Sequence, residues 1–291
     1  MLSLALPKGS LEAATLRLFE EADLPVDRAS DRDYRPSIRD PRISEVRILR
    51  PQEIPHYVAE GMFDLGIAGR DWISETGAEV VTLTELRYSK ATQRPIRVVL
   101  AVPRESPVES VADLPSGVKV STELPNITER FFREHGIEAD IRLSYGATEA
   151  KVPDIVDAIV ELTETGSSLR AAGLKIVGEI MSSYTELFAN PKAYEDLEKR
   201  KAMEQICTLL TGTLEARGRV LVKLNVDEAK LDDVIAILPS LKAPTVSKLF
   251  GEGAYAVETV VPKDEINVLI PALKDHGATD IVELPISKIV H

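Results

Sequence analysis

The last quarter of the chain shows the pattern that most restricts how the chain can fold. Four short apolar or alternating segments are typical of strands, and they lie at 220–226, 245–249, 255–261 and 281–286. Apolar residues recur at helical spacing between the first two segments, over 231–238, and between the last two, over 266–273. The order βαββαβ predicts a C-terminal ferredoxin-like domain over residues 217–291. Such domains often sense small molecules, but the fold alone does not determine a function.

The residues before this domain alternate between predicted strands and helices in two successive series. The first series starts with a strand at 2–6 and the second with a strand at 97–102, and one long helix is expected over 192–216. This α/β alternation predicts two lobes that face each other across a ligand cleft, as in periplasmic-binding-protein-like folds. We expect lobe I to comprise residues 1–90 and about 180–215, and lobe II to comprise residues 91–179.

Composition narrows the partners and the compartment that we expect. The 291 residues carry a formal net charge of −12, which argues against a nucleic-acid surface because neutralising phosphates needs a basic patch. Cys207 is the single cysteine, so a disulfide within the chain is excluded and a reducing, cytoplasmic location is expected. The start MLSLALPKGS is typical of a strand rather than a signal peptide, and no apolar run approaches the roughly 20 residues of a membrane span.

A hydroxyl-rich turn between a predicted strand and a predicted helix is the main candidate for a ligand site. The apolar run 155–160 is predicted to be the strand, with Asp154 and Asp157 as its acids, and the turn is Thr163-Glu164-Thr165-Gly166-Ser167-Ser168. The first N–H groups of a helix lack intrahelical partners, and glycine allows close approach, so the turn can hold a phosphate. A nearby carboxylate would then bind sugar hydroxyls or a magnesium ion. The alternative is an ordinary capped helix start.

Further candidates follow other predicted strands. Lys8 lies in the turn after the first strand, Arg50 ends a strand near residue 49, and Gly69 and Asp71 begin a helix after a short buried strand. In open α/β sheets, ligands bind outside the carboxyl ends of the strands, so Lys8, Gly69 and Asp71 are expected to line one crevice. For Lys8, the alternative is a solvent-exposed surface side chain.

The segment 27–50 is a basic island in an acidic chain. It holds seven arginines, Arg28, Arg32, Arg35, Arg39, Arg42, Arg47 and Arg50. Two interpretations stay open: the island faces an anionic ligand, or it is a solvent-exposed hairpin whose arginines pair with neighbouring acids.

Together these segments resemble the ATP phosphoribosyltransferase family, and the resemblance covers essentially the whole chain. It rests on ALPKG at 5–9, DLGIAGRD at 64–71, Pro125-Asn126, Glu149, and Asp157-Ala158-Ile159 followed by ETGSSL at 164–169. The combination is specific, whereas each segment alone is not. The C-terminal domain looks like that of the long form of the family, which carries its own histidine-sensing domain.

The resemblance implies a reaction and a set of site residues. N1 of the adenine of ATP attacks C1 of the ribose of phosphoribosyl pyrophosphate (PRPP), pyrophosphate leaves, and Mg²⁺ is the cofactor, bound mainly through substrate phosphates. Catalysis would rest on positioning and charge stabilisation. The residues implied for catalysis are Asp157, Asp154 and Lys8. Those implied for PRPP binding are Glu164, Thr165, Gly166, Ser167, Ser168 and Leu169, and those implied for ATP binding are Arg50, Gly66, Gly69, Asp71 and Glu149.

For the C-terminal domain, the resemblance implies feedback inhibition by histidine and assembly into dimers and hexamers. The segments expected to bind histidine are Ala243-Pro244-Thr245 and the loop after Leu249, which includes Gly251. Inhibition would couple two distinct sites through subunit packing. Whether AMP also binds is left open.

Some positions depart from the family pattern. Ser10 stands where Arg is frequent, Leu124 where Tyr is common, and Ser168 where Thr is usual. Glu164 adds a negative charge beside the phosphate turn, so we expect its side chain to point away from the ligand. Two other functions remain as alternatives, a two-lobed solute-binding protein and a catalytically silent regulatory relative of the enzyme.

Overall fold

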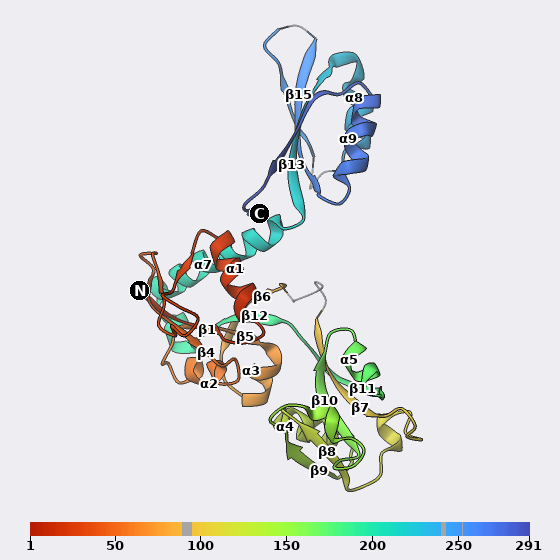
Figure 1. Ribbon diagram of the computed structural model, residues 1–291. Helices are drawn as coiled ribbons and strands as arrows, with labels where there is room; N and C mark the ends of the chain where they lie inside the picture. The colour runs from red at the N-terminus through yellow and green to blue at the C-terminus, as the bar shows by residue number, and fades with distance from the viewer. Residues whose placement is uncertain (89–94, 240–242, 252) are drawn as a thin grey trace. The chain divides into compact units, whose positions relative to one another are not determined.

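The computed structural model describes residues 1–88, 95–239, 243–251 and 253–291 (Figure 1). The chain divides into two compact units, Met1–Leu210 and Thr211–His291. Among the described residues, the first unit contains two five-stranded sheets and a two-stranded ribbon, and the second unit contains a four-stranded sheet.

The first sheet and its helices form lobe I, and its strand order is β4-β1-β5-β12-β6. β1 (Leu2–Pro7) pairs in parallel with β4 (Ile43–Leu49) and with β5 (Leu65–Gly69), whereas β12 (Thr185–Ala189) lies antiparallel between β5 and β6 (Val81–Leu86). The helices that follow β1, β4 and β5 are α1 (Glu12–Glu21), α2 (Ile54–Ala59) and α3 (Arg70–Thr76). The apolar run LGIAG of β5 is fully buried, as expected for a central strand covered on both faces.

The second sheet and its helices form lobe II, with the strand order β11-β7-β10-β8-β9. β10 (Ala158–Thr163), β8 (Val118–Thr122) and β9 (Ala139–Leu143) run parallel. β7 (Ile96–Pro103) lies antiparallel to β10 and to β11 (Leu174–Ser183). Its helical segments are η1 (Val111–Asp113), α4 (Pro125–Glu134), η2 (Thr148–Lys151) and α5 (Ser167–Ala171).

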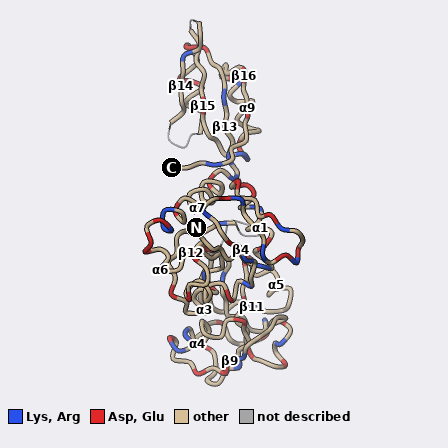
Figure 2. Tube along the Cα trace, turned by 90° about the vertical axis from the view of Figure 1, so that its left-hand side faces the viewer, with Lys and Arg blue, Asp and Glu red and all other residues tan. Residues whose placement is uncertain are grey.

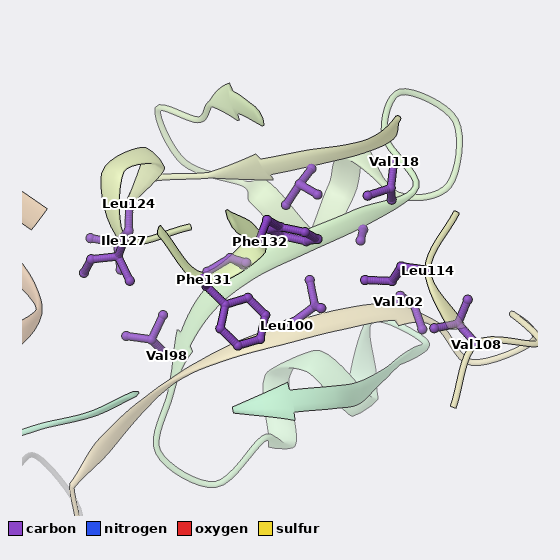
Figure 3. Close-up of a cluster of buried hydrophobic side chains, with 13 residues drawn as sticks. Val98, Leu100, Val102, Val108, Leu114, Val118, Leu124, Ile127, Phe131 and Phe132 are labelled. Atoms are coloured by element: carbon purple, nitrogen blue, oxygen red, sulfur yellow. The ribbon is translucent and has the colours of Figure 1, made fainter. Parts of the chain in front are cut away.

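The core of lobe II shows why its sequence folds in this way. α4 has apolar residues at helical spacing, and its Phe131 and Phe132 lie in one cluster with Val98 and Leu100 of β7 (Figure 3). The chain passes between the two sheets twice, from β6 to β7 and from β11 to β12. Two sheets joined by two crossings confirm the periplasmic-binding-protein-like, two-lobed architecture.

The second unit confirms the ferredoxin-like prediction. β13 (Arg219–Asp227), β14 (Thr245–Lys248), β15 (Ala254–Pro262) and β16 (Thr279–Pro285) form an antiparallel sheet in the order β14-β15-β13-β16. α8 (Leu231–Ile237), preceded by η3 (Glu228–Lys230), and α9 (Ile266–Asp275) complete the order βαββαβ. Val222, Leu224 and Val257 of the sheet pack with Val234 of α8 and Leu273 of α9 in one buried cluster.

Several local expectations are wrong. The predicted helix 192–216 is two helices, α6 (Pro191–Glu195) and α7 (Leu197–Ala216), because Asp196 between them is extended and its carboxylate accepts the N–H groups of Glu198 at 2.9 Å and Lys199 at 3.1 Å. The strand expected over 155–160 begins only at Ala158 and extends to Thr163. This shift of three residues decides which acid lies beside the phosphate turn.

The basic island is partly neutralised by nearby acids, and Figure 2 shows Lys and Arg interspersed with Asp and Glu along the tube of the first unit. It forms a ribbon of β2 (Val26–Asp27) and β3 (Ser37–Ile38) that leads into β4. Four of its arginines make ion pairs, Arg28 with Glu12, Arg39 with Asp27, Arg42 with Asp40, and Arg47 with Glu45. These pairs favour the hairpin interpretation for most of the segment.

Candidate active site

A cavity of about 320 Å³ in the first unit is lined by residues of both lobes. Lobe I contributes residues from the ends of its strands and from α3, and lobe II contributes the end of β10, the start of β7 and the end of β11. The lining residues are Ser10, Leu11, Pro51, Gly69, Asp71, Trp72, Leu86, Arg87, Tyr88, Ile96, Leu162, Thr163, Glu164, Ser183, Tyr184 and Thr185. The carboxyl ends of β1, β4, β5 and β10 all contribute to the lining, as expected for a ligand site in an α/β fold.

Asp71 is the buried acid of this cavity. It lies in the first turn of α3, its side chain accepts a hydrogen bond from the Ser183 hydroxyl at 2.8 Å, and it is 5% exposed. Burial raises the pKa of Asp71, and the hydrogen bond from Ser183 opposes this rise. A Cβ on Gly69 would lie 1.9 Å from Asp71 Oδ1, so glycine is required where the chain enters α3. The structure therefore brings Gly69 and Asp71 together, as predicted.

A charged network supports this wall of the cavity from behind. Arg70 donates to Glu186 at 2.6 Å and to Glu85 at 2.7 Å. Glu186 is 3% exposed, and Thr82 donates to its second oxygen at 2.8 Å. A buried carboxylate needs such partners, and the network thereby ties α3 to β6 and β12.

Lys8 and Arg50 lie beside the cavity, next to its lining residues Ser10 and Pro51. The Lys8 ammonium is 3.6 Å from Glu12 and 4.7 Å from the centre of the Tyr34 ring. Arg50 Nη1 is 3.8 Å from the position that a Cβ on Gly9 would take. The structure thus places both cations at the turn after β1, with Arg50 exposed to solvent.

The phosphate turn folds as the sequence predicts. Gly166 has φ +72°, a left-handed conformation that favours glycine, and its N–H donates to the Thr163 hydroxyl at 2.8 Å. The Thr165 hydroxyl donates to Ser167 Oγ at 2.9 Å. Ser167, Ser168 and Leu169 form the first turn of α5, so the N–H groups of Ser168 and Leu169 have no partner within the helix.

Asp154 and Asp157 do not lie beside this turn. Both precede β10, and the six residues of that strand, at about 3.3 Å each, separate them from the turn by about 20 Å. The Asp157 carboxylate instead accepts the backbone N–H of Lys119 at 2.9 Å, at the amino end of β8. The premise for their predicted roles, an acid at the strand end next to the turn, therefore does not hold for these two residues.

The acid that does lie near the turn is Glu161. It precedes Thr163 by two residues on β10, and because side chains alternate along a strand, both lie on the same face of the sheet. Burial raises the pKa of Glu161, and the negative charges of Glu123 and Glu149 add to this rise. The sequence signal for Glu161 is its spacing of two residues from Thr163. This signal was missed because the strand was expected over 155–160, which leaves out both residues.

Three further predicted residues lie in different surroundings. Glu164 is one of the residues that line the cavity, and the expectation that its side chain points away from the phosphate stays a prediction. A Cβ on Gly66 would lie 2.7 Å from Ile54 and 2.9 Å from Phe188, so this glycine serves the packing of α2 and β12 on β5. Glu149 is exposed in η2, near Glu161.

The residues predicted to bind histidine lie on or next to β14, the edge strand of the second unit. Thr245 begins β14, Ala243 and Pro244 precede it, and Gly251 follows that strand with φ +128°. β14 is exposed along its length, and Phe250 beside Gly251 is fully exposed.

The described residues contain neither a cluster of metal-binding side chains nor a membrane-spanning helix. In residues 1–88, 95–239, 243–251 and 253–291, no group of three His, Cys, Asp or Glu side chains is placed to hold a metal ion. Within the same ranges, no helix has the length and apolar composition of a membrane span.

The class of protein follows from comparison with known proteins. The family model for ATP phosphoribosyltransferase matches residues 50–212, and the model described as the HisG C-terminal domain matches residues 216–288. A chain of the ATP phosphoribosyl transferase (HisG:HisZ) complex from Thermotoga maritima is similar to this one with a TM-score of 0.63 and 26% identity, over 74% of this chain and 99% of that chain. The two-lobed fold and the two matching family models together define this chain as a pentosyltransferase with a C-terminal regulatory domain.

Full-length relatives narrow the class to a family. The chain is 47% identical to the ATP phosphoribosyltransferase of Pelotomaculum thermopropionicum and 46% identical to that of Desulforudis audaxviator, each over 99% of both chains. This chain belongs to the ATP phosphoribosyltransferase family, in the long form that carries the C-terminal domain. The family catalyses the first step of histidine biosynthesis.

Proposed function

We propose that the cavity between the lobes binds PRPP at the end of β10 and ATP at the start of α3, so that N1 of adenine attacks C1 of the ribose. The observation that carries this proposal is that Glu164 of the phosphate turn and Asp71 of α3 line one cavity. We assign residues 1–90 and about 180–215 to lobe I, 91–179 to lobe II and 217–291 to the regulatory domain. Since β11 extends to Ser183 within the lobe II sheet, the boundary expected near residue 180 moves to Tyr184, where the chain crosses back to lobe I.

The phosphate turn is the proposed site of the 5′-phosphate of PRPP. Backbone N–H groups at the start of α5 and the hydroxyl groups around Gly166 supply donors to the phosphate oxygens. The residues assigned to this contact are Thr165, Gly166, Ser167, Ser168 and Leu169. Glu164 repels a phosphate, so we assign its carboxylate to the cavity beyond the turn.

Glu161 is the proposed acid for the ribose hydroxyls, in place of Asp157 and Asp154. An ionised carboxylate accepts hydrogen bonds from two neighbouring hydroxyls and stabilises positive charge that develops at C1 as pyrophosphate leaves. Its position on the same strand face as Thr163 supports this role. The remaining part of the catalysis is positioning of the two substrates.

The nucleotide side is assigned to Asp71, Gly69 and Arg50, with Lys8 as a second cation for phosphate oxygens. Asp71 and Gly69 line the cavity, and Lys8 and Arg50 flank it. Glu149 is exposed near Glu161, and we assign it to positioning the substrates from the lobe II side of the cavity.

Mg²⁺ is the proposed cofactor; it would bind mainly through substrate phosphates and would neutralise charge on the pyrophosphate. Mg²⁺ keeps most of its waters and binds through substrate phosphates more often than in a cage of protein ligands. A site whose phosphate donors are backbone N–H groups and hydroxyls fits this mode of binding.

The second unit is the proposed histidine sensor. Ala243, Pro244, Thr245 and Gly251 lie on or next to the exposed edge strand β14, which is accessible to a ligand and to a second subunit. Inhibition through dimers and hexamers would couple this site to the cleft. We assign the enzyme to the cytoplasm, where ATP is available, and leave AMP as a ligand to be tested in the same assay.

The test is formation of phosphoribosyl-ATP from ATP, PRPP and Mg²⁺, with and without histidine. Product that falls when histidine is added supports both the reaction and the sensor. Loss of ATP that depends on PRPP separates the enzyme from a solute-binding protein. Absence of product from folded protein that still binds PRPP would contradict the proposal and favour a silent regulatory relative.

A further inference from the structure

A chain of buried hydroxyl groups links Lys151 to Glu161. The Lys151 ammonium donates to Ser144 Oγ at 2.5 Å, and Ser144 Oγ lies 2.8 Å from Thr148 Oγ1. The Thr148 side chain in turn lies beside the Glu161 carboxylate and favours its ionised form, which also accepts the N–H of Leu162 at 3.0 Å. Ser144 and Thr148 are 2% and 1% exposed, so bulk water does not compete for these bonds.

The chemistry of the two ends determines the direction of the protons along this chain. An ammonium group only donates, so Ser144 accepts from Lys151, and its own proton goes to Thr148 Oγ1 at 2.8 Å, with the Gly146 carbonyl at 3.3 Å as the more distant acceptor. An ionised carboxylate only accepts, so Thr148 donates to Glu161. Hydrogen bonds aligned in one direction polarise one another, and the cation at one end strengthens the donor at the other.

The charges near Glu161 make the positive charge of Lys151 important for keeping this carboxylate ionised. Among the residues described, Lys151 makes no ion pair, and its other hydrogen bond is to Ser121 Oγ at 3.4 Å. Glu123 and Glu149 face Glu161 and oppose its negative charge. The cations on the neighbouring elements are used elsewhere: Arg97 of β7 is 3.5 Å from Glu179, and Arg170 of α5 donates to the Thr165 carbonyl.

We propose that Lys151 is a positioning residue of this enzyme, which acts through Ser144 and Thr148 to orient the Glu161 carboxylate and keep it ionised beside the phosphate turn. This inference rests on the proposed role of Glu161 at the ribose of PRPP. It assigns a function to the loop between β9 and β10, whose residues come together at the carboxyl ends of three parallel strands.

The test is kcat/KM for PRPP in the full chain as a function of pH, from about pH 5 to 9. Lys151→Met should move the acidic limb of the profile to higher pH by about one unit, because Glu161 loses a donor that favours its ionised form. Lys151→Arg, which keeps the charge and donors, should retain most of the original limb. Lys175→Met is the matched control, since Lys175 pairs with Glu109 on the same sheet and should leave the profile unchanged.

A double-mutant cycle tests the path through the hydroxyls. Thr148→Val should give the same shift as Lys151→Met, and the double variant should shift no further, because the chain is already broken. Shifts that add, or a limb that Lys151→Met does not move, would overturn the inference. Thr148→Ser keeps the hydroxyl and should retain the wild-type pH profile, which separates loss of the hydroxyl from loss of folding. If the wild-type protein forms no phosphoribosyl-ATP, the result contradicts the proposed function rather than the role of Lys151.

Discussion

Gly166 and Gly173 have nearly the same backbone conformation in different surroundings. Their φ angles are +72° and +75°, but a Cβ on Gly166 would lie 3.0 Å from Arg170 and 3.3 Å from Ile176, whereas a Cβ on Gly173 meets nothing within 4 Å. Gly166→Ala should lower kcat/KM for PRPP about 10-fold or more, because it distorts the phosphate turn, and should also destabilise the fold by about 1–2 kcal/mol. Steady-state kinetics and denaturant unfolding measure the two effects.

Gly173→Ala is the matched control for that variant. It carries the same left-handed penalty at the end of α5, outside the phosphate turn, so it should lower stability without changing kcat/KM for PRPP. Equal kinetic losses in both variants would mean that backbone strain alone, and not the turn, is responsible.

Glu161 and Asp157 form a second pair of matched substitutions. Glu161→Gln should lower kcat about 100-fold or more, because it removes the charge proposed to stabilise the ribosyl centre. Asp157→Asn should change kcat much less, since its carboxylate accepts a backbone N–H at the amino end of β8. Turnover of the folded variants at saturating substrate is the measurement. A large loss in Asp157→Asn with normal turnover in Glu161→Gln would restore the assignment made from the sequence.

This pair shows what the sequence alone could predict about the site. The phosphate turn was predictable because Gly166 and its hydroxyl-bearing neighbours carry a local signal. The acid was not, because the apolar run starts at Ile155 while pairing with β7 and β8 begins the strand at Ala158. Strand ends depend on partners distant in sequence, so the choice between Asp157 and Glu161 required the sheet register.

At the scale of elements, a contact between α3 and α4 joins the two lobes. α4 begins with Pro125 after Leu124, which has no side-chain acceptor to cap the helix. Glu75 of α3 fills this role: its two carboxylate oxygens accept the N–H groups of Asn126 and Ile127, each at 2.9 Å. Glu75 is 7% exposed, so these bonds are shielded from water.

Glu75→Ala should therefore destabilise the chain by about 1–3 kcal/mol, because two N–H groups at a helix start lose their acceptor. Denaturant unfolding of the full chain gives this free energy. Glu129→Ala, at an exposed position of the same helix, is the control and should change stability by less than about 0.5 kcal/mol. A Glu75 variant as stable as the control would show that water replaces the carboxylate at the helix start.

Elements with strong local patterns were predictable, and those defined by distant pairing were not. The βαββαβ order of the second unit follows from apolar spacing within each segment. β12, by contrast, is inserted antiparallel between β5 and β6, more than 90 residues earlier in the chain, and its short sequence TELFA has no distinctive pattern. The two-lobed fold was thus predictable as a class, while its sheet order required the structure.

At the scale of the whole molecule, the regulatory unit should be separable from the chemistry. The PRPP and ATP assignments all fall within Met1–Leu210, and the histidine assignments all fall within Thr211–His291. Deleting residues 217–291 should therefore abolish inhibition by histidine while PRPP-dependent formation of phosphoribosyl-ATP continues, although the end of α7 loses the hydrogen bond from Ile289 to Gly212. The measurement is initial rate against histidine concentration for both lengths of chain, with Thr245→Ala in the full chain as a milder second variant. Full histidine sensitivity in the active truncated chain would place the sensor in the first unit and leave the ferredoxin-like domain with an assembly role alone.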